Sequence, residues 1–247
     1  MSAPRPIVAG TYLLSPVLRL LNTSSGLGNG SGTGGATAYE GYAVALISRG
    51  SESLNALASS IKESGGQANT FPVPPYGADE IAAAFSAIHE QYPSSEYAIK
   101  VAIFNIGQTV GGPFHQLTAE DIRESNKINI ESSFAFACGA ISAFQQNEGT
   151  TTGKGTLVFT GATASVRGNV TTSGFASAKF AEFGQQDIHA RRLHAIIDGR
   201  VATGNVRGDR NTPPSGPAYL FLVNQDRAAW TWELDRQCFF LQFELKN

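Results

Sequence analysis

The sequence has few charged residues, and positive and negative charges nearly balance. Charged residues make up 15% of the 247, the formal net charge is -2, and no run of like charges stands out. A face that binds nucleic acid or an anionic membrane surface needs clustered lysine and arginine, which this composition does not supply. We therefore expect no nucleic-acid partner and no membrane partner.

Cysteine and histidine are also scarce. The two cysteines, Cys138 and Cys238, lie far apart and form no CxxC pair, so reduced thiols in a cytoplasmic protein are the simplest interpretation. The four histidines have no spacing to acids or cysteines that is typical of metal ligands. The sequence therefore predicts no metal site.

Apolar runs long enough to cross a membrane are absent from the sequence. The apolar stretch IVAGTYLLSPVLRLL near the N-terminus is interrupted by Pro16 and Arg19. A signal peptide is one interpretation of this stretch, and a buried strand or an irregular insertion is the one that we favour. Residues 1–27 therefore form an atypical N-terminal segment.

Apolar runs rich in strand formers alternate with segments of helical periodicity. Strands are expected within residues 42–48, 97–107, 155–161 and 194–199. Helices are expected over residues 51–65, 78–92, 118–144 and 173–183. Thr118 and Asp121 resemble a capping box at the start of the longest helix. This order predicts one α/β domain over residues 1–247, a Rossmann-like doubly wound parallel sheet with helices on both faces.

Glycine is concentrated in one stretch, GLGNGSGTGG. Within it Gly28, Gly32 and Gly34 form GxxxGxG, a turn that lets the backbone approach a pyrophosphate closely. The other interpretation is a flexible loop. The strand expected over 42–48 favours a phosphate-binding loop, whereas the strand before it is less clear. PIVAG fits well but lies far upstream, and VLRLLN is closer but weaker.

The expected strand over residues 42–48 ends in Ser48 and is followed by Arg49. In dinucleotide-binding folds this point meets the adenosine ribose. An acid there would hydrogen-bond the ribose diol, whereas Arg49 would attract a 2′-phosphate. This favours NADP over NAD, and the alternative is a solvated arginine at a strand end.

Taken in order, the motifs resemble those of the short-chain dehydrogenase/reductase family over residues 28–235. GNGSGTG resembles its TGxxxGxG, NIG resembles its NAG, and DGRVAT resembles the PGxxxT that closes over the nicotinamide. Asn129 matches the asparagine of the long helix, and Lys179 matches the lysine of YxxxK. GATAS, FASAKFA and WTWELD resemble a divergent branch common in bacteria and fungi.

The resemblance implies NADP(H) as the cofactor. It also implies a set of residues that contact this cofactor: Gly28, Gly30, Ser31, Gly32, Thr33, Gly34, Ser48, Arg49, Asn105, Gly107, Lys179, Gly199 and Thr203.

Two departures from the family pattern fall on the catalytic positions. Phe175 stands at the tyrosine position and Ala162 at the serine position, so neither can donate a proton. The polar residues left near the chemistry are Lys179, Asn129 and Asp198. Asp198 could act as an acid or base if burial raised its pKa, or it could cap a nearby turn.

The sequence thus predicts an NADP(H)-binding oxidoreductase with an incomplete Ser-Tyr-Lys set, acting on a small carbonyl or imine/iminium substrate. An iminium is already cationic and needs no acid. Two alternatives stay open: an inactive cofactor-binding pseudoenzyme or scaffold, and a fungal secondary-metabolism iminium reductase or cyclase.

Several segments are shorter than the corresponding segments of the short-chain dehydrogenase/reductase family. Six residues separate Gly34 from Gly41, and eight separate Lys179 from Ile188. Residues 11–27 look like an insertion between the first strand and the glycine loop, and the lid region after Thr203 is compressed. The resemblance implies a homodimer or homotetramer, but the helix that usually builds its interface is shortened.

Overall fold

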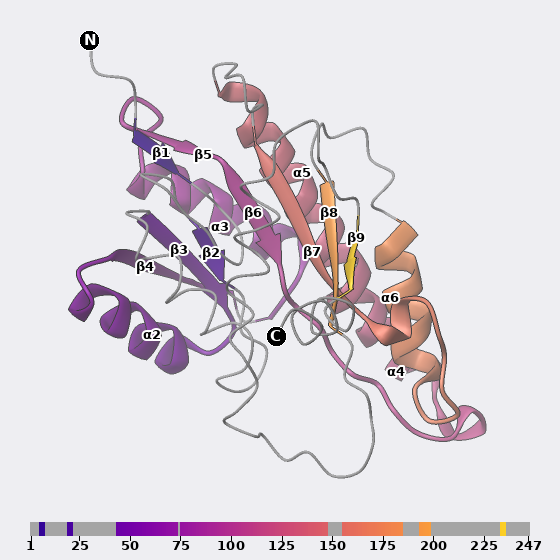
Figure 1. Cartoon of the computed structure of the whole chain (residues 1–247). Helices are drawn as coiled ribbons and strands as arrows, with labels where there is room; N and C mark the ends of the chain where they lie inside the picture. The colour runs from indigo at the N-terminus through magenta and orange to yellow at the C-terminus, as the bar shows by residue number, and fades with distance from the viewer. Residues whose placement is uncertain are drawn as a thin grey trace, which may run out of the picture.

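The computed structural model describes residues 43–73, 75–147 and 155–184, together with four short strands. All strand pairings in this part of the chain are parallel. Figure 1 shows the strands side by side, with helices packed against them.

The described strands form three hydrogen-bonded groups, and the inner edges of the two larger groups lie in contact. The first group has the order β2 (Arg19–Leu21), β3 (Ala43–Ser48) and β4 (Gln67–Pro72). The second has the order β6 (Val101–Phe104), β7 (Thr156–Ala162), β8 (Leu193–Asp198) and β9 (Glu233–Asp235). Because β2 lies against β6, the chain winds outward from the middle in both directions, as in a Rossmann fold.

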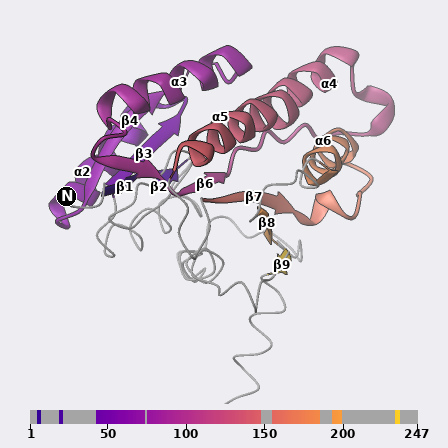
Figure 2. The same cartoon turned by 90° about the horizontal axis from the view of Figure 1, so that it is seen from above.

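The helices divide between the two faces. They are α2 (Ser51–Glu63), α3 (Ala78–Gln91), α4 (Ala119–Asn126), α5 (Ser132–Gln146) and α6 (Ser173–Gly184). Figure 2 shows α3, α4, α5 and α6 along one side of the sheet. The connection from β3 through α2 to β4 steps along the sheet in the direction opposite to that of the steps from β6 to β9. A right-handed crossover therefore places α2 on the other face. The doubly wound fold predicted from the sequence is confirmed.

The central strands are apolar because they are covered on both faces. Every residue of β3 (AVALIS) and of β6 (VAIF) is buried, which is typical of parallel strands between two helical layers. A chain of aromatic rings joins the layer of α3 and α5 to the sheet: Phe85 contacts Phe136, Phe136 contacts Phe104, and Phe104 contacts Phe159, with centroid distances of 5.5, 5.5 and 6.0 Å. This core holds the carboxyl ends of the strands in fixed positions.

The prediction that residues 11–27 form an insertion is wrong for three of these residues. Residues 19–21, within the stretch that looked the weaker of two candidates, form the strand that pairs with β3. The stronger candidate, β1 (Arg5–Ile7), pairs with β5 (Tyr97–Ile99) instead. Pairing partners and burial on both faces, rather than local strand propensity, decide which segment occupies the centre of a sheet.

The single helix expected over residues 118–144 is also corrected. It begins as predicted, with Thr118 and Asp121 in a capping box. A π-helical segment, η2 (Lys127–Glu131), then separates α4 from α5. Just after this segment, the Ser133 hydroxyl donates to the carbonyl oxygen of Ile130, which lies within it, at 2.8 Å. Single π-turns are frequent at functional sites, and this one carries Asn129.

Two strands were not predicted. The edge strand β4 (QANTFP) has mixed burial and ends in a proline, so it shows neither a continuous apolar run nor strict alternation. The strand β9 lies within WTWELD and has only three residues. Both are recognised by their pairing with neighbours and not by their composition.

Candidate functional site

The candidate site lies at the carboxyl ends of the parallel strands. Ser48 ends β3, Asn105 follows β6, and Ala162 ends β7. Asp198, the last residue of β8, is in register with Ala162. Because parallel strands end at the same edge, these positions from distant parts of the chain meet along one edge of the sheet.

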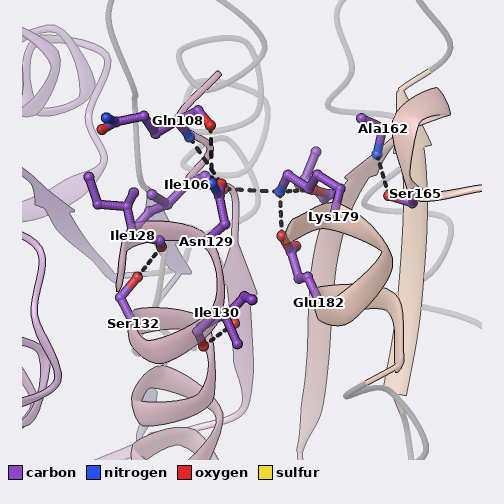
Figure 3. A network of polar contacts seen from close by, with 12 residues as sticks. Ile106, Gln108, Ile128, Asn129, Ile130, Ser132, Ala162, Ser165, Lys179 and Glu182 are labelled. Atoms are coloured by element: carbon purple, nitrogen blue, oxygen red, sulfur yellow. Dashed lines mark hydrogen bonds and ion pairs between the residues drawn. The ribbon is translucent and has the colours of Figure 1, made fainter. Parts of the chain in front are cut away.

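Lys179 is the most buried cation of the site, with 3% of the residue exposed. Its ammonium donates to Ile106 O at 3.2 Å, to Thr160 O at 3.3 Å and to the Glu182 carboxylate (Figure 3). An ammonium has three donors and no acceptor. All three are therefore engaged by acceptors within the protein.

Glu182 lies three residues after Lys179 on α6 and is 1% exposed. One carboxylate oxygen accepts from Lys179, and the other, Oε1, has no hydrogen-bond partner among the described residues. Burial raises the pKa of Glu182 to about 7, although the neighbouring Lys179 ammonium acts in the opposite direction. Sequence reasoning missed this residue, although an acid three residues after a lysine in an otherwise uncharged helix was a visible signal.

Asn129 is fully buried in η2 and holds the loop that follows β6. Its Oδ1 accepts from the Gln108 backbone N–H, and its Nδ2 donates to Gln108 O and to Ser125 O, each at 3.0 Å. Gly107 packs closely beside it: a Cβ at Gly107 would lie 3.6 Å from Lys179 Cε and 3.9 Å from Asn129 Oδ1. The structure thus brings together Asn129, Gly107 and Lys179, which the sequence predicted separately.

Phe175 lies in the first half of α6, four residues before Lys179, and is partly buried. Its backbone N–H donates to Val110 O at 3.2 Å, which joins the helix to the loop after β6. At the serine position, the Ala162 N–H donates to the Ser165 hydroxyl at 3.1 Å, and Ser165 is itself buried. Ser165 therefore accepts a hydrogen bond from the backbone at the serine position.

Arg49 is fixed in place by a tyrosine that sequence reasoning did not identify. The Tyr76 hydroxyl accepts from the Arg49 backbone N–H at 3.2 Å and donates to Ser48 Oγ at 3.3 Å. The Arg49 guanidinium carbon lies 5.0 Å from the centroid of the Tyr76 ring, a cation–π contact. Tyr76 is 1% exposed, whereas Arg49 is exposed, so a buried ring presents an accessible guanidinium at the end of β3.

Several predicted residues lie outside the described part of the chain: Gly28, Gly30, Ser31, Gly32, Thr33, Gly34, Gly199 and Thr203. For Asp198 the structure describes the strand position alone. No cluster of three or more metal-ligating side chains occurs among the described residues. In the same residues, no helix has the length and apolar character needed to span a membrane.

Comparisons with known proteins agree with this geometry. The family model for short chain dehydrogenase matches residues 21–196. A short-chain dehydrogenase from Rhodopseudomonas palustris is 26% identical, with a TM-score of 0.70 over 87% of this chain and 96% of that chain. No curated relative matches the chain.

Two further structures share the fold at 19% identity. One is a metagenomic short-chain oxidoreductase in complex with NADP, with a TM-score of 0.71 over 90% of this chain and 96% of that chain. The other is an alcohol dehydrogenase from the archaeon Thermococcus sibiricus complexed with 5-hydroxy-NADP, with a TM-score of 0.72 over 87% and 94%.

Proposed function

This chain belongs to the short-chain dehydrogenase family, and on that premise we propose that it is an NADP(H)-dependent reductase of a small carbonyl or imine/iminium compound. The cofactor would lie along the carboxyl edge of the sheet. Arg49, Ser48 and the loop at Asn105 and Gly107 are the described residues that would hold it. When bound, the cofactor would supply the hydride.

The preference for NADP(H) rests on Arg49. Its guanidinium is exposed at the end of β3, its backbone N–H is held by Tyr76, and its side chain lies over the Tyr76 ring. A fixed guanidinium is suited to a phosphate, which accepts parallel hydrogen bonds from it. The NADP and 5-hydroxy-NADP in the two structures of the same fold support this choice.

The substrate class follows from the missing proton donors, and this observation carries the proposal. Reducing a ketone creates an alkoxide that needs a proton, but Phe175 and Ala162 carry no hydroxyl. Reducing an iminium neutralises a cation and needs none. An apolar wall at positions 175 and 162, with the Asp198 position in register with Ala162, suits a cationic C=N group. We therefore place cyclic iminium ions, including imines that are already protonated when they bind, before ketones.

A second candidate is a protein that binds the cofactor without turnover. The observation that favours it is the Lys179 ammonium, whose three donors are engaged by Ile106 O, Thr160 O and Glu182. A lysine in this state is not free to bind the nicotinamide ribose. NADPH binding without turnover of ketones or cyclic imines would select this candidate.

The cofactor assignment is tested by an Arg49→Ala variant. We expect its Kd for NADPH to rise about 10- to 100-fold, because charge-assisted hydrogen bonds to the 2′-phosphate are lost. The weaker affinity for NADH, which lacks this phosphate, should not change. NADPH fluorescence measures both constants.

The matched control is Arg123→Ala, because Arg123 is also exposed but lies on α4, paired with Glu120. It should leave both constants unchanged. Full NADPH preference in Arg49→Ala would refute the 2′-phosphate assignment, and failure of the unaltered protein to bind either cofactor would refute the proposed function.

A further inference from the structure

The reduction proposed above gives no role to Glu182, which forms an ion pair with Lys179. Both residues lie on α6, and both are almost completely buried. Figure 3 shows the ammonium between the Glu182 carboxylate and the loop at Ile106. The pair therefore sits directly behind the loop that would face the cofactor.

Glu182 is the strongest of the three acceptors around the ammonium. The bonds to Ile106 O and Thr160 O, at 3.2 and 3.3 Å, are long for N–H···O hydrogen bonds and involve neutral acceptors. Above pH 7, where Glu182 is ionised, its bond to Lys179 joins two charged groups away from water, and such bonds are about twice as strong as neutral ones. The carboxylate thus determines where the ammonium rests.

The carboxylate in turn depends on the lysine. Among the described residues, Lys179 is the hydrogen-bond partner of Glu182, and Oε1 has none. The elements packed against α6 carry six other charged residues, of which Lys127 is half-buried and the rest are exposed: Glu120, Asp121, Arg123, Glu124, Lys127 and Glu131. Moving the ammonium away would leave a buried carboxylate without its counter-charge, which is costly.

We propose that Glu182 is a positioning residue that holds the Lys179 ammonium inside the protein, so that a bound nicotinamide ribose must compete with this carboxylate for it. The inference rests on the proposed binding of NADP(H). It implies that Glu182 weakens the binding of the nicotinamide half of the cofactor and leaves the adenosine half unaffected.

A Glu182→Gln variant separates the two halves. The amide keeps the shape of the side chain and still accepts a hydrogen bond, but it carries no charge. Binding is measured for NADPH and for 2′,5′-ADP, which has the 2′-phosphate but no nicotinamide ribose. We expect the Kd for NADPH to fall about tenfold, because a neutral acceptor releases the ammonium more easily. The Kd for 2′,5′-ADP should stay unchanged.

The two ligands also distinguish the failure of this inference from the failure of the proposed function. If neither protein binds either ligand, the proposed function fails and the inference fails with it. If 2′,5′-ADP binds but the NADPH constant is the same in both proteins, the inference alone is overturned. An equal change for both ligands would show a general loosening of the fold and would also overturn it.

A measurement on the unaltered protein covers the case in which Glu182→Gln does not fold. The 13C resonance of the Glu182 carboxyl is recognised by its raised pKa, and it is followed during addition of each ligand. Saturating NADPH should shift this resonance because the ammonium is drawn toward the ribose, whereas 2′,5′-ADP should not. A resonance that ignores NADPH would overturn the inference.

Discussion

Position 175 holds a phenylalanine, whose ring has no hydroxyl, in a helix whose backbone is fully formed around it. The Phe175 N–H bonds to Val110 O, and Lys179 follows four residues later on the same helix. A tyrosine differs from phenylalanine by one oxygen atom, so the change can supply a proton donor with little rearrangement. The missing acid can therefore be tested separately from the rest of the site.

We expect a Phe175→Tyr variant to raise NADPH-dependent ketone reduction by about 100- to 10,000-fold, the range that a positioned general acid contributes. Reduction of cyclic iminium ions should change little because it needs no proton. The kcat/KM for each substrate class measures this. Phe180→Tyr is the control, since Phe180 lies on the same helix but is 48% exposed. Equal effects of the two substitutions would contradict the assignment of position 175.

At the scale of elements, the packing of α3 against α5 depends on a glycine within α5. A Cβ at Gly139 would lie 2.6 Å from the Phe85 ring, closer than real contacts allow. The ring fills this space and continues to Phe136, with centroids 5.5 Å apart. Helix propensity favours alanine over glycine, so packing outweighs propensity at this position.

A Gly139→Ala variant should therefore lower the free energy of unfolding by about 1–3 kcal/mol, the usual cost of overpacking a core. Urea denaturation measures it. Gly184→Ala is the control, because no atom of the described residues lies within 4 Å of a Cβ built there, and its effect should be small. A Phe85→Leu substitution added to Gly139→Ala should recover part of the loss, and additive losses would argue against the contact.

At the scale of the whole molecule, the buried Glu182 makes stability depend on pH. Its pKa is raised from 4.5 in the unfolded chain to about 7 in the folded protein, mainly by burial. The folded state thus holds the proton more tightly, so this contribution is fully present below pH 4.5 and is lost as the pH rises through 7. Two other groups act in the opposite direction. Burial lowers the pKa of His89, and hydrogen bonds from Thr118 lower the pKa of Asp121.

The difference in unfolding free energy between the unaltered protein and Glu182→Gln isolates this group. We expect the difference to fall by on the order of 3 kcal/mol between pH 4.5 and 7, since each pKa unit corresponds to about 1.4 kcal/mol. Urea denaturation at a series of pH values measures it. A difference that rises with pH would mean that the ion pair, and not burial, dominates the pKa of Glu182.

Assembly of the whole molecule stays a prediction. The exposed rings of Phe134 on α5 and Phe180 on α6, 54% and 48% exposed, offer apolar surface for a second copy. The structure describes α6 as far as Gly184, and the shortened interface helix inferred from the sequence stays a prediction. A pairing of copies, which we propose from the family, would use these exposed rings.

The sequence by itself determined the fold class and most of the elements. Apolar runs predicted β3, β6 and β7, and helical periodicity predicted α2 and α3. The capping box placed the start of α4 at Thr118. The sequence also predicted the positions of Asn129, Gly107 and Lys179, because residue types at fixed spacing are local features. The structure places these three residues close together, and their roles at the site stay a prediction.

Tertiary structure decided what depends on neighbours distant in the sequence. It placed residues 19–21 beside β3, introduced the π-helical segment at Asn129, and set Tyr76 under Arg49. It also buried Glu182 and directed the Lys179 ammonium toward it. The spacing of Lys179 and Glu182 is visible in the sequence, but the burial of both residues is not, because burial arises only when separate elements exclude water from the space between them.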